Sequence, residues 1–239
     1  MAKTPRSRFP ELPLSPAFYD ALARVGARFG LGLGNERALS AAVAALSQTY
    51  TRDRAALSDG RLGPDATLAR LGFFLPRDAI KVFGPLEELA RAGRLPAGPR
   101  LRVLDVGAGL GATSLGVARF LRHAGSAVER IHLTAIERDP LSVRLLTALC
   151  AAVSALPQEF VPIELTARAA DLRQQDVEGR FDLIVLGFVL NELFLERDAG
   201  ARSLARAELL RGLMQKLSAD GALIVLEPAL RESARELML

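Results

Sequence analysis

Three glycines at every second position follow an apolar run of the chain and precede a helical stretch. The run Leu101 to Val106 has the composition of a buried strand, and a helix is expected from about Thr113 to Leu121. Because glycine has no Cβ, such a turn lets a ligand lie directly against backbone atoms at the end of the strand. The residues that this turn offers to a ligand are Asp105, Gly107, Ala108, Gly109 and Gly111.

Two classes of ligand use a glycine turn, and they differ in charge. A dinucleotide places its pyrophosphate on the helix N-terminus with the pattern G-x-G-x-x-G/A, which Gly107, Gly109 and Ala112 satisfy. S-adenosylmethionine (SAM) carries no phosphate, and its binders share the pattern D/E-x-G-x-G-x-G, which the chain matches from Asp105 to Gly111. A carboxylate beside the turn repels a pyrophosphate and attracts the ammonium group of a methionine moiety, so Asp105 favours SAM. A tight turn without a ligand is the third alternative.

Acidic residues also end the next two predicted strands. Glu137 lies 28 residues after Gly109, where a carboxylate can accept both ribose hydroxyls, and an insertion at 125–130 accounts for the long spacing. Asp171 ends the third strand and is a candidate partner for the adenine amine, or an ordinary turn residue. Arg138 and Leu172, which directly follow these acids, complete the predicted cofactor site.

Asn191 and Glu192 follow the fourth apolar run, at the strand end that faces the ligand crevice of a doubly wound sheet. They are the candidates for contact with a methyl acceptor, although Asn191 is equally suited to cap the following helix. No catalytic residue is assigned beyond these two, because transfer of a methyl group from a sulfonium depends mostly on alignment.

Other reactive residue types are few. The single cysteine, Cys150, falls in an apolar helical stretch and is expected to be a buried structural thiol. Of two histidines, His123 and His132, we expect solvated or helix-end positions outside the crevice, and no metal site. Arginines at helical spacing are either phosphate contacts or a solvated face. They are Arg202, Arg206 and Arg211, with Arg138 and Arg144 after the second strand.

Composition narrows the class of protein. The 239 residues are 50% hydrophobic and 24% charged, which excludes a disordered chain. The formal net charge of +4 is a weak indication of an anionic partner such as RNA. One cysteine excludes an intrachain disulfide framework, and no run has the length of a membrane-spanning helix, so we expect a cytoplasmic protein. The basic Met1 to Arg8 segment leaves a mitochondrial presequence as an alternative.

The elements that must position these residues fall into two regions. Helix starts at Ser15-Pro16 and Asn35, and a helix over 78–92 interrupted at Gly84-Pro85, predict an all-helical region over 1–95. A Pro/Gly-rich stretch at 93–99 then separates it from an α/β domain over 100–239. In that domain apolar runs alternate with helical stretches, which predicts a Rossmann-like, doubly wound, mostly parallel sheet with both faces covered. The runs are 101–106, 131–136, 162–169, 183–188 and 222–226.

Several segments together resemble the ribosomal small-subunit methyltransferase-like family, within the class I SAM-dependent methyltransferases. They are Leu104–Gly111, Ile136–Asp139, Asp182–Leu193, Leu226–Pro228, and upstream Phe74–Pro76 with the region of Tyr50 and Arg52. The resemblance covers roughly residues 40 to 235. It implies a SAM-binding domain that acts on, or assembles with, the small ribosomal subunit and its RNA.

The chain departs from that family at its C-terminal end. The resemblance implies a seven-stranded sheet and a cysteine-bearing segment after the fifth strand, whereas five strands are predicted here and the sequence stops at Leu239. Without the final antiparallel hairpin the fifth strand would be an uncovered edge. Of three explanations, namely truncation, an edge covered by the N-terminal helices and an edge covered by another chain, truncation is favoured.

Four functions follow from these patterns. The first is a SAM-dependent methyltransferase acting on ribosomal RNA or a ribosomal protein, and the second a non-catalytic, SAM-binding ribosome assembly factor. The third is a small-molecule methyltransferase that uses its helical region as a lid. The last, which depends on Gly107, Gly109 and Ala112 alone, is an NAD-dependent oxidoreductase. The oligomeric state is left open.

Overall fold

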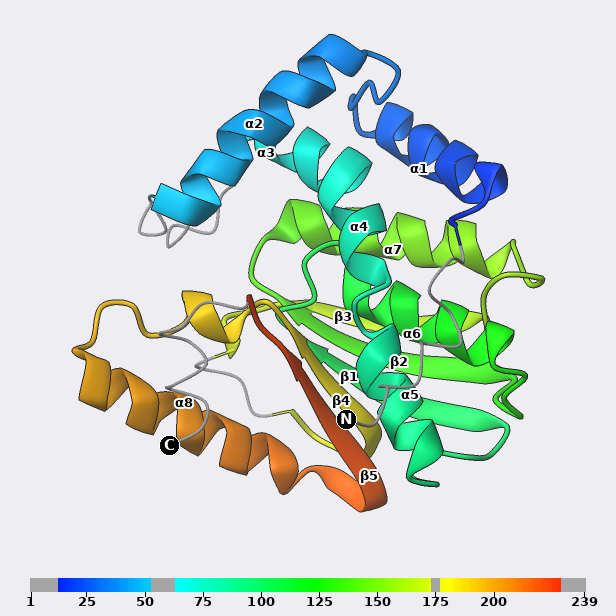
Figure 1. Ribbon diagram of the computed structural model, residues 1–239, viewed down its shortest axis with the longest axis vertical. Helices are drawn as coiled ribbons and strands as arrows, with labels where there is room; N and C mark the ends of the chain where they lie inside the picture. The colour runs from blue at the N-terminus through cyan, green and yellow to red at the C-terminus, as the bar shows by residue number, and fades with distance from the viewer. Residues whose placement is uncertain (1–12, 53–62, 173–176, 229–239) are drawn as a thin grey trace, which may run out of the picture.

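Five parallel strands form the centre of the molecule in the computed structural model, which describes residues 13–52, 63–172 and 177–228 (Figure 1). The strands are β1 Arg100–Val106, β2 Arg130–Glu137, β3 Ile163–Ala169, β4 Phe181–Gly187 and β5 Leu217–Leu226. Their order in the sheet is β3-β2-β1-β4-β5, and every neighbouring pair is parallel. The chain therefore reverses its direction of travel across the sheet at β1, which is the switch point of a doubly wound, Rossmann-like fold. The predicted fold class is confirmed.

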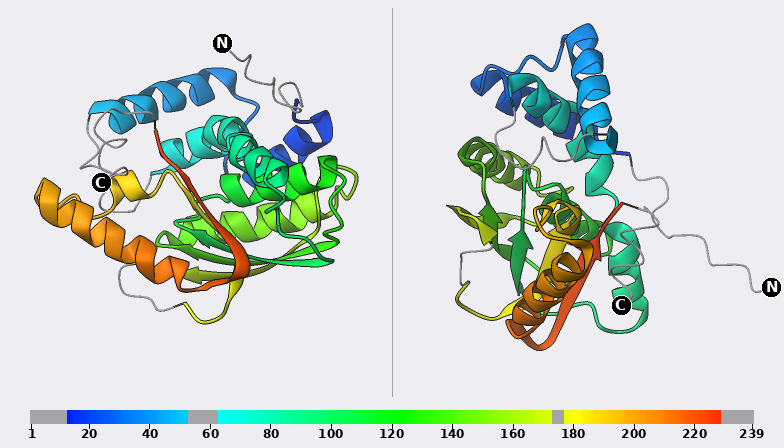
Figure 2. Two further views of the ribbon diagram at one scale, coloured as in Figure 1. Left: turned by 60° about the horizontal axis from the view of Figure 1, so that its bottom comes forward. Right: turned by 90° about the vertical axis from the view of Figure 1, so that its left-hand side faces the viewer.

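The two faces of the sheet bury different side chains because successive residues of a strand point to opposite sides. Val103, Leu133 and Val185 belong to one buried cluster, and Leu104, Ile136 and Ile184 belong to another. Helices α6 Ala112–His123 and α7 Pro140–Ser154 cover the first face, and α8 Ala199–Met214 lies on the second (Figure 2). The short 3-10 helix η4 Leu190–Glu192 follows β4.

The N-terminal region is helical, as predicted. It comprises α1 Pro16–Arg28, α2 Glu36–Arg52, α3 Pro64–Ala69, the π-helical turn η2 Arg70–Phe74, α4 Leu75–Ala79 and α5 Phe83–Arg91. The Ser15 hydroxyl accepts a hydrogen bond from the Phe18 N–H (3.1 Å), and Asn35 Oδ1 accepts one from the Ala38 N–H (3.0 Å). Both predicted helix starts are thereby confirmed.

The predicted interruption at Gly84-Pro85 was wrong in position. The break lies between α4 and α5, and Gly84 and Pro85 fall inside the first turn of α5. A proline costs little there because the N–H groups of the first turn have no partner within the helix.

Aromatic contacts join the N-terminal helices to the sheet domain. The rings of Phe18 and Phe160 stack at 5.5 Å, and those of Phe83 and Phe120 meet edge to face at 5.5 Å. One buried cluster extends from Phe18 in α1 to Ile224 in β5. The change from helices to α/β structure falls at the predicted stretch 93–99, and the two regions pack on a common core.

Helices lie on both faces of the sheet, and among the described residues the α8 side of β3 is partly exposed. β3 alternates partly buried and exposed residues, and Thr166 and Arg168 are exposed on the α8 side. The described part of the β3-to-β4 connection contains no α-helix, so that corner of the sheet carries polar side chains instead. None of the helices within the described ranges is long and apolar enough to cross a membrane. The basic N-terminus, the second helix beyond Arg52 and the C-terminal stop lie outside the described residues.

Candidate functional site

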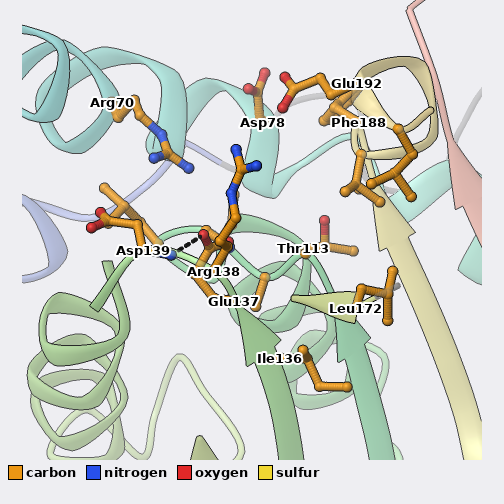
Figure 3. A pocket seen from close by; sticks show the side chains of 18 of the residues that line it. Arg70, Asp78, Thr113, Ile136, Glu137, Arg138, Asp139, Leu172, Phe188 and Glu192 are labelled. Carbon is orange, nitrogen blue, oxygen red and sulfur yellow. Dashed lines mark hydrogen bonds between the residues drawn. The ribbon is translucent and has the colours of Figure 1, made fainter. Parts of the chain in front are cut away.

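A cavity of about 460 Å³ lies at the carboxyl ends of β1, β2 and β4 (Figure 3). The floor is made by the glycine turn and by the ends of the strands, and residues 170–172 and 187–196 form its sides. The N-terminal helices supply the roof, which consists of Tyr50, Arg70, Phe74, Leu75 and Asp78. The helical region and the sheet domain therefore enclose the cavity together.

The glycine turn is anchored to the next strand. The N–H groups of Gly107 and Ala108 both donate to the Ile136 carbonyl, at 2.9 and 3.0 Å. Gly107, Gly109 and Gly111 have φ values of +67°, +54° and +84°, a region that residues with a Cβ rarely occupy. Glycine at these positions thus follows from backbone conformation as well as from space.

Each of these glycines also leaves room for a different neighbour. A Cβ at Gly107 would collide with Val189, one at Gly109 with the guanidinium of Arg70, and one at Gly111 with Leu146. Gly107 and Gly109 line the cavity with Ala108, as predicted, but Gly111 does not. The structure corrects the assignment of Gly111, whose missing Cβ accommodates the packing of α6 against α7.

Glu137 lines the cavity and ties the turn to the end of β2. Its Oε2 accepts a hydrogen bond from the Gly109 N–H (2.7 Å), and its Oε1 accepts one from the Asp139 N–H (2.9 Å; Figure 3). A carboxylate offers about four acceptor positions, so these bonds leave capacity for the hydroxyls of a ligand. The position is the one predicted for a ribose contact.

Asp105 does not line the cavity, which corrects the expectation that it contacts the methionine end of a ligand. It lies on the same side of β1 as Val103, facing α6, where its Oδ2 accepts a hydrogen bond from the Ser114 hydroxyl at 2.5 Å. The pKa of Asp105 is raised to about 7, chiefly because the carboxyl group is buried; the hydrogen bonds with Ser114 partly offset this effect, and the nearby Glu137 adds to it. Asp105 therefore joins the end of β1 to the first turn of α6, on either side of the glycine turn.

The other predicted cofactor residues do reach the cavity. Arg138, Asp171 and Leu172 line it, and Figure 3 shows the Arg138 side chain extending between Arg70 and Asp78. Asp139 lines it as well, and also caps α7 by accepting from the N–H groups of Leu141 (3.1 Å) and Ser142 (3.0 Å). Its predicted role as an N-cap is confirmed.

The two acceptor-side candidates are separated by the structure. Glu192 lines the cavity, whereas Asn191 does not, and Asn191 Oδ1 is buried with no hydrogen-bond partner among the described residues. The alternative that Asn191 caps the following helix is wrong, because α8 is capped by Asp198, which accepts from the Ala201 N–H (2.9 Å).

The remaining reactive residues lie away from the cavity. Cys150 is buried in α7, and burial raises its pKa to about 12, as expected of a structural thiol. His123 ends α6, whereas His132 lies within β2 and its Nδ1 is 3.4 Å from Glu164. No group of three His, Cys, Asp or Glu among the described residues is arranged to hold a metal ion.

One of the predicted phosphate contacts is not on a solvated face. Arg206 is only 8% exposed, and its Nη2 donates to the Leu193 carbonyl (3.1 Å), because α8 packs this side against the segment after β4. Arg144 and Arg211 are exposed, and Arg202 is partly buried.

The roof was not predicted from the sequence. Tyr50 and the segment Phe74–Pro76 were noted only as part of a family resemblance, and Arg70 and Asp78 were not singled out. Desolvation raises the pKa of the Tyr50 hydroxyl, which lies near the charges of Arg70, Glu192 and Asp78. Asp78 is paired with Arg77 (2.7 Å) and Lys81 (2.8 Å).

More carboxylates than cations line the cavity. Two arginines, Arg70 and Arg138, line it against six carboxylates, of which Asp78 is paired with cations outside the lining; the other five are Glu137, Asp139, Asp171, Glu192 and Glu196. A cavity of this charge favours cationic ligands and disfavours phosphates.

The fold and the site together define a Rossmann-like domain with a cavity at its switch point, the place where doubly wound sheets bind nucleoside-type ligands. No protein-family model matches the chain, and no curated protein matches it.

Several solved structures have a fold similar to that of this chain, and some of them are named as methyltransferases. One is a S-adenosylmethionine-dependent methyltransferase from Clostridium acetobutylicum ATCC 824, with 11% identity, a TM-score of 0.43, and coverage of 61% of this chain and 49% of that one. Another is SAM-bound CalS10, an amino pentose methyltransferase from Micromonospora echinaspora, with 22% identity, a TM-score of 0.41 and coverage of 64% and 51%. TehB from Haemophilus influenzae has 15% identity, a TM-score of 0.37 and coverage of 59% and 39%. The chain matches about half of these proteins' length or less.

Proposed function

We propose that this chain is a SAM-dependent methyltransferase whose cofactor occupies the cavity above the glycine turn. The observation that carries the proposal is that the glycine turn and Glu137, joined by a hydrogen bond, both line one cavity that contains several other carboxylates. SAM carries a sulfonium and an ammonium group against one carboxylate, so its net charge complements the lining. A dinucleotide would bring a pyrophosphate into the same field.

The hydrogen bonds of the turn also disfavour a dinucleotide. A pyrophosphate at a glycine turn is bound by backbone N–H groups. In this turn the Gly109 N–H donates to Glu137, and those of Gly107 and Ala108 donate to Ile136, so these three groups already have partners. Together with the acidic lining of the cavity, this favours SAM over a dinucleotide.

Different residues of the cavity would bind different parts of the cofactor. Glu137 has acceptor capacity left for the ribose hydroxyls, and we assign Asp171 and Leu172, which also line the cavity, to the adenine. The backbone of Gly107 to Gly109 gives the methionine part room to approach. When bound, SAM supplies an already activated methyl group, so the chain's task is to exclude water and to align the acceptor, with Glu192 on the acceptor side.

Calorimetric titration of the protein with SAM, its demethylated product and NADH, in parallel, tests the cofactor. We expect saturable binding of the first two and none of NADH. Saturable binding of NADH with no heat from SAM would overturn the proposal in favour of an oxidoreductase.

For the acceptor, we propose ribosomal RNA or a protein of the small ribosomal subunit. The support is the sequence resemblance in Leu104–Gly111, Asp182–Leu193 and Leu226–Pro228, together with the net positive charge of the chain. Small-subunit particles incubated with the protein and methyl-labelled SAM should take up label. If the protein binds the particles tightly but transfers no label, the result would favour a non-catalytic assembly factor over an enzyme. Transfer of label to a small molecule of a cell extract would indicate a small-molecule methyltransferase.

A further inference from the structure

The segment after β4 is held in a conformation that its sequence does not favour. We call residues 188–194 the β4 loop; it includes η4 and contributes Phe188, Val189 and Glu192 to the cavity. Both of its end residues, Phe188 and Phe194, have φ of +62°, and the structure shows no other non-glycine residue with positive φ among those it describes. Bulky side chains rarely adopt this conformation, and such strain persists only where surrounding contacts impose it.

The first half of the β4 loop is fastened to the end of β5. The Phe188 N–H donates to the Leu226 carbonyl (2.8 Å), and the Leu190 N–H donates to Oε1 of Glu227 (2.9 Å). Glu227, which directly follows β5, thus accepts from the first N–H group of η4. The Glu227-Pro228 pair also belongs to the family resemblance, and no part of the proposed cofactor site uses it.

The second half of the loop is fastened to α8. Arg206 donates from Nη2 to the Leu193 carbonyl (3.1 Å), immediately before the strained Phe194. The two phenylalanine rings also meet cations, because Lys81 Nζ lies 4.4 Å from the Phe188 ring centre and the Arg197 guanidinium 4.9 Å from that of Phe194. Charged groups therefore hold both ends of the loop.

Placing the charged groups of Glu227 and Arg206 away from water costs free energy of folding. Oε2 of Glu227 is buried with no hydrogen-bond partner among the described residues, and Arg206 is almost wholly buried. Glu227 is partly buried, and the Arg206 charge lies near enough to act on its carboxyl group. An apolar side chain could neither accept from the Leu190 N–H nor donate to the Leu193 carbonyl, so these two charged residues are explained by the backbone groups of the β4 loop that they bind.

We propose that Glu227 and Arg206 are positioning residues for methyl transfer, which hold the strained β4 loop so that Val189 rests on Gly107 and Glu192 faces the bound cofactor. The inference rests on the proposed function for its role in methyl transfer. The restraint of the loop itself follows from the contacts alone, so the two claims are tested separately.

The restraint should depend on pH. The pKa of Glu227 is raised to about 7, chiefly by burial; the N–H groups of Leu190 and Asn191 and the Arg206 charge on α8 partly offset this effect, and Glu192 on the loop adds to it. Protonation makes Glu227 a weaker acceptor and removes its attraction to Arg206. The loop is therefore held most firmly above about pH 7 and is loosened below it.

Hydrogen exchange followed by mass spectrometry measures the restraint directly. At pH 7.5 we expect peptides that cover the β4 loop to exchange at least tenfold faster in Glu227→Ala and Arg206→Met than in the unmodified protein. Glu227→Gln keeps an acceptor oxygen and should be intermediate. The matched controls are Glu208→Gln, an exposed acid on α8, and Arg24→Met, an exposed arginine on α1, and both should leave the loop unchanged.

The affinity for SAM connects the restraint to function. We expect the dissociation constant for SAM to rise fivefold or more in Glu227→Ala, and to rise more between pH 8 and pH 6 in the unmodified protein than in Glu227→Gln, in which Asp105 still titrates. Exchange of the loop as slow as in the unmodified protein, in folded Glu227→Ala or Glu227→Gln, would overturn the proposal. If the unmodified protein binds no SAM, the proposed function fails, and the exchange of the loop still decides whether Glu227 and Arg206 restrain it.

Discussion

Removing the carboxylate of Glu137 should weaken SAM binding, and it also removes two hydrogen bonds that anchor the glycine turn. The side chain accepts from the N–H groups of Gly109 (2.7 Å) and Asp139 (2.9 Å) and offers its remaining acceptor positions to the ribose. A hydrogen bond to a charged group contributes roughly 1.5–3 kcal/mol. Loss of one such bond to the ribose lowers the affinity by about tenfold to 150-fold. Glu137→Ala should fall in this range, and loosening of the glycine turn adds to the loss.

Calorimetric titration with SAM is the assay, with thermal unfolding of each variant as the measure of folding. Glu129→Ala is the matched control, because Glu129 is an exposed acid just before the other end of β2. The control should bind SAM with the affinity of the unmodified protein. Equal affinities for Glu137→Ala and the control, in folded samples, would refute the assignment of Glu137 to the ribose.

Three further predictions concern the residues around the turn. Because burial raises the folded-state pKa of Asp105 to about 7 from 3.8, the free energy of unfolding should fall as the pH rises from about 4 to 7, by at most about 1.4 kcal/mol per unit, and then level off. Urea denaturation should show a shallower fall in Asp105→Asn, and equal slopes would contradict the raised pKa. Gly111→Ala should lose about 2 kcal/mol or more of stability, since φ is +84° and the Cβ meets Leu146, whereas Gly32→Ala has open space and should lose little; equal losses in thermal unfolding would count against this packing. Cys150, with a pKa of about 12, should react with a thiol reagent at pH 7.5 only on unfolding, and rapid labelling of the folded protein would show that the thiol is accessible.

The sequence was sufficient for the sheet because its signals are local. The apolar runs over 101–106, 131–136 and 183–188 lie within β1, β2 and β4 or end one residue past them, and the glycine turn follows β1 as predicted. The sequence also contained the orientation of Asp105, since it alternates with Leu101 and Val103 on the side of β1 that faces α6. This alternation directs Asp105 towards α6, whereas its charge alone predicts a contact with a methionine ammonium group.

The roof and the β4 loop could not be predicted in this way because their contacts join distant segments. Arg70 meets Gly109 only when the N-terminal helices pack on α6 and α7, and no local pattern indicates that contact. Likewise, Glu227 reaches Leu190 because β5 lies beside β4 in the sheet. Periodicity predicts which residues share a face of one element, but not which element will cover that face.

A crystal structure of the protein with the demethylated product of SAM tests the central claim most directly. We predict the nucleoside in the cavity between the glycine turn and the roof, with its ribose hydroxyls about 2.7–3.0 Å from the Glu137 carboxylate and its adenine beside Asp171 and Leu172. A ligand bound elsewhere on the molecule, with none in this cavity, would contradict the account.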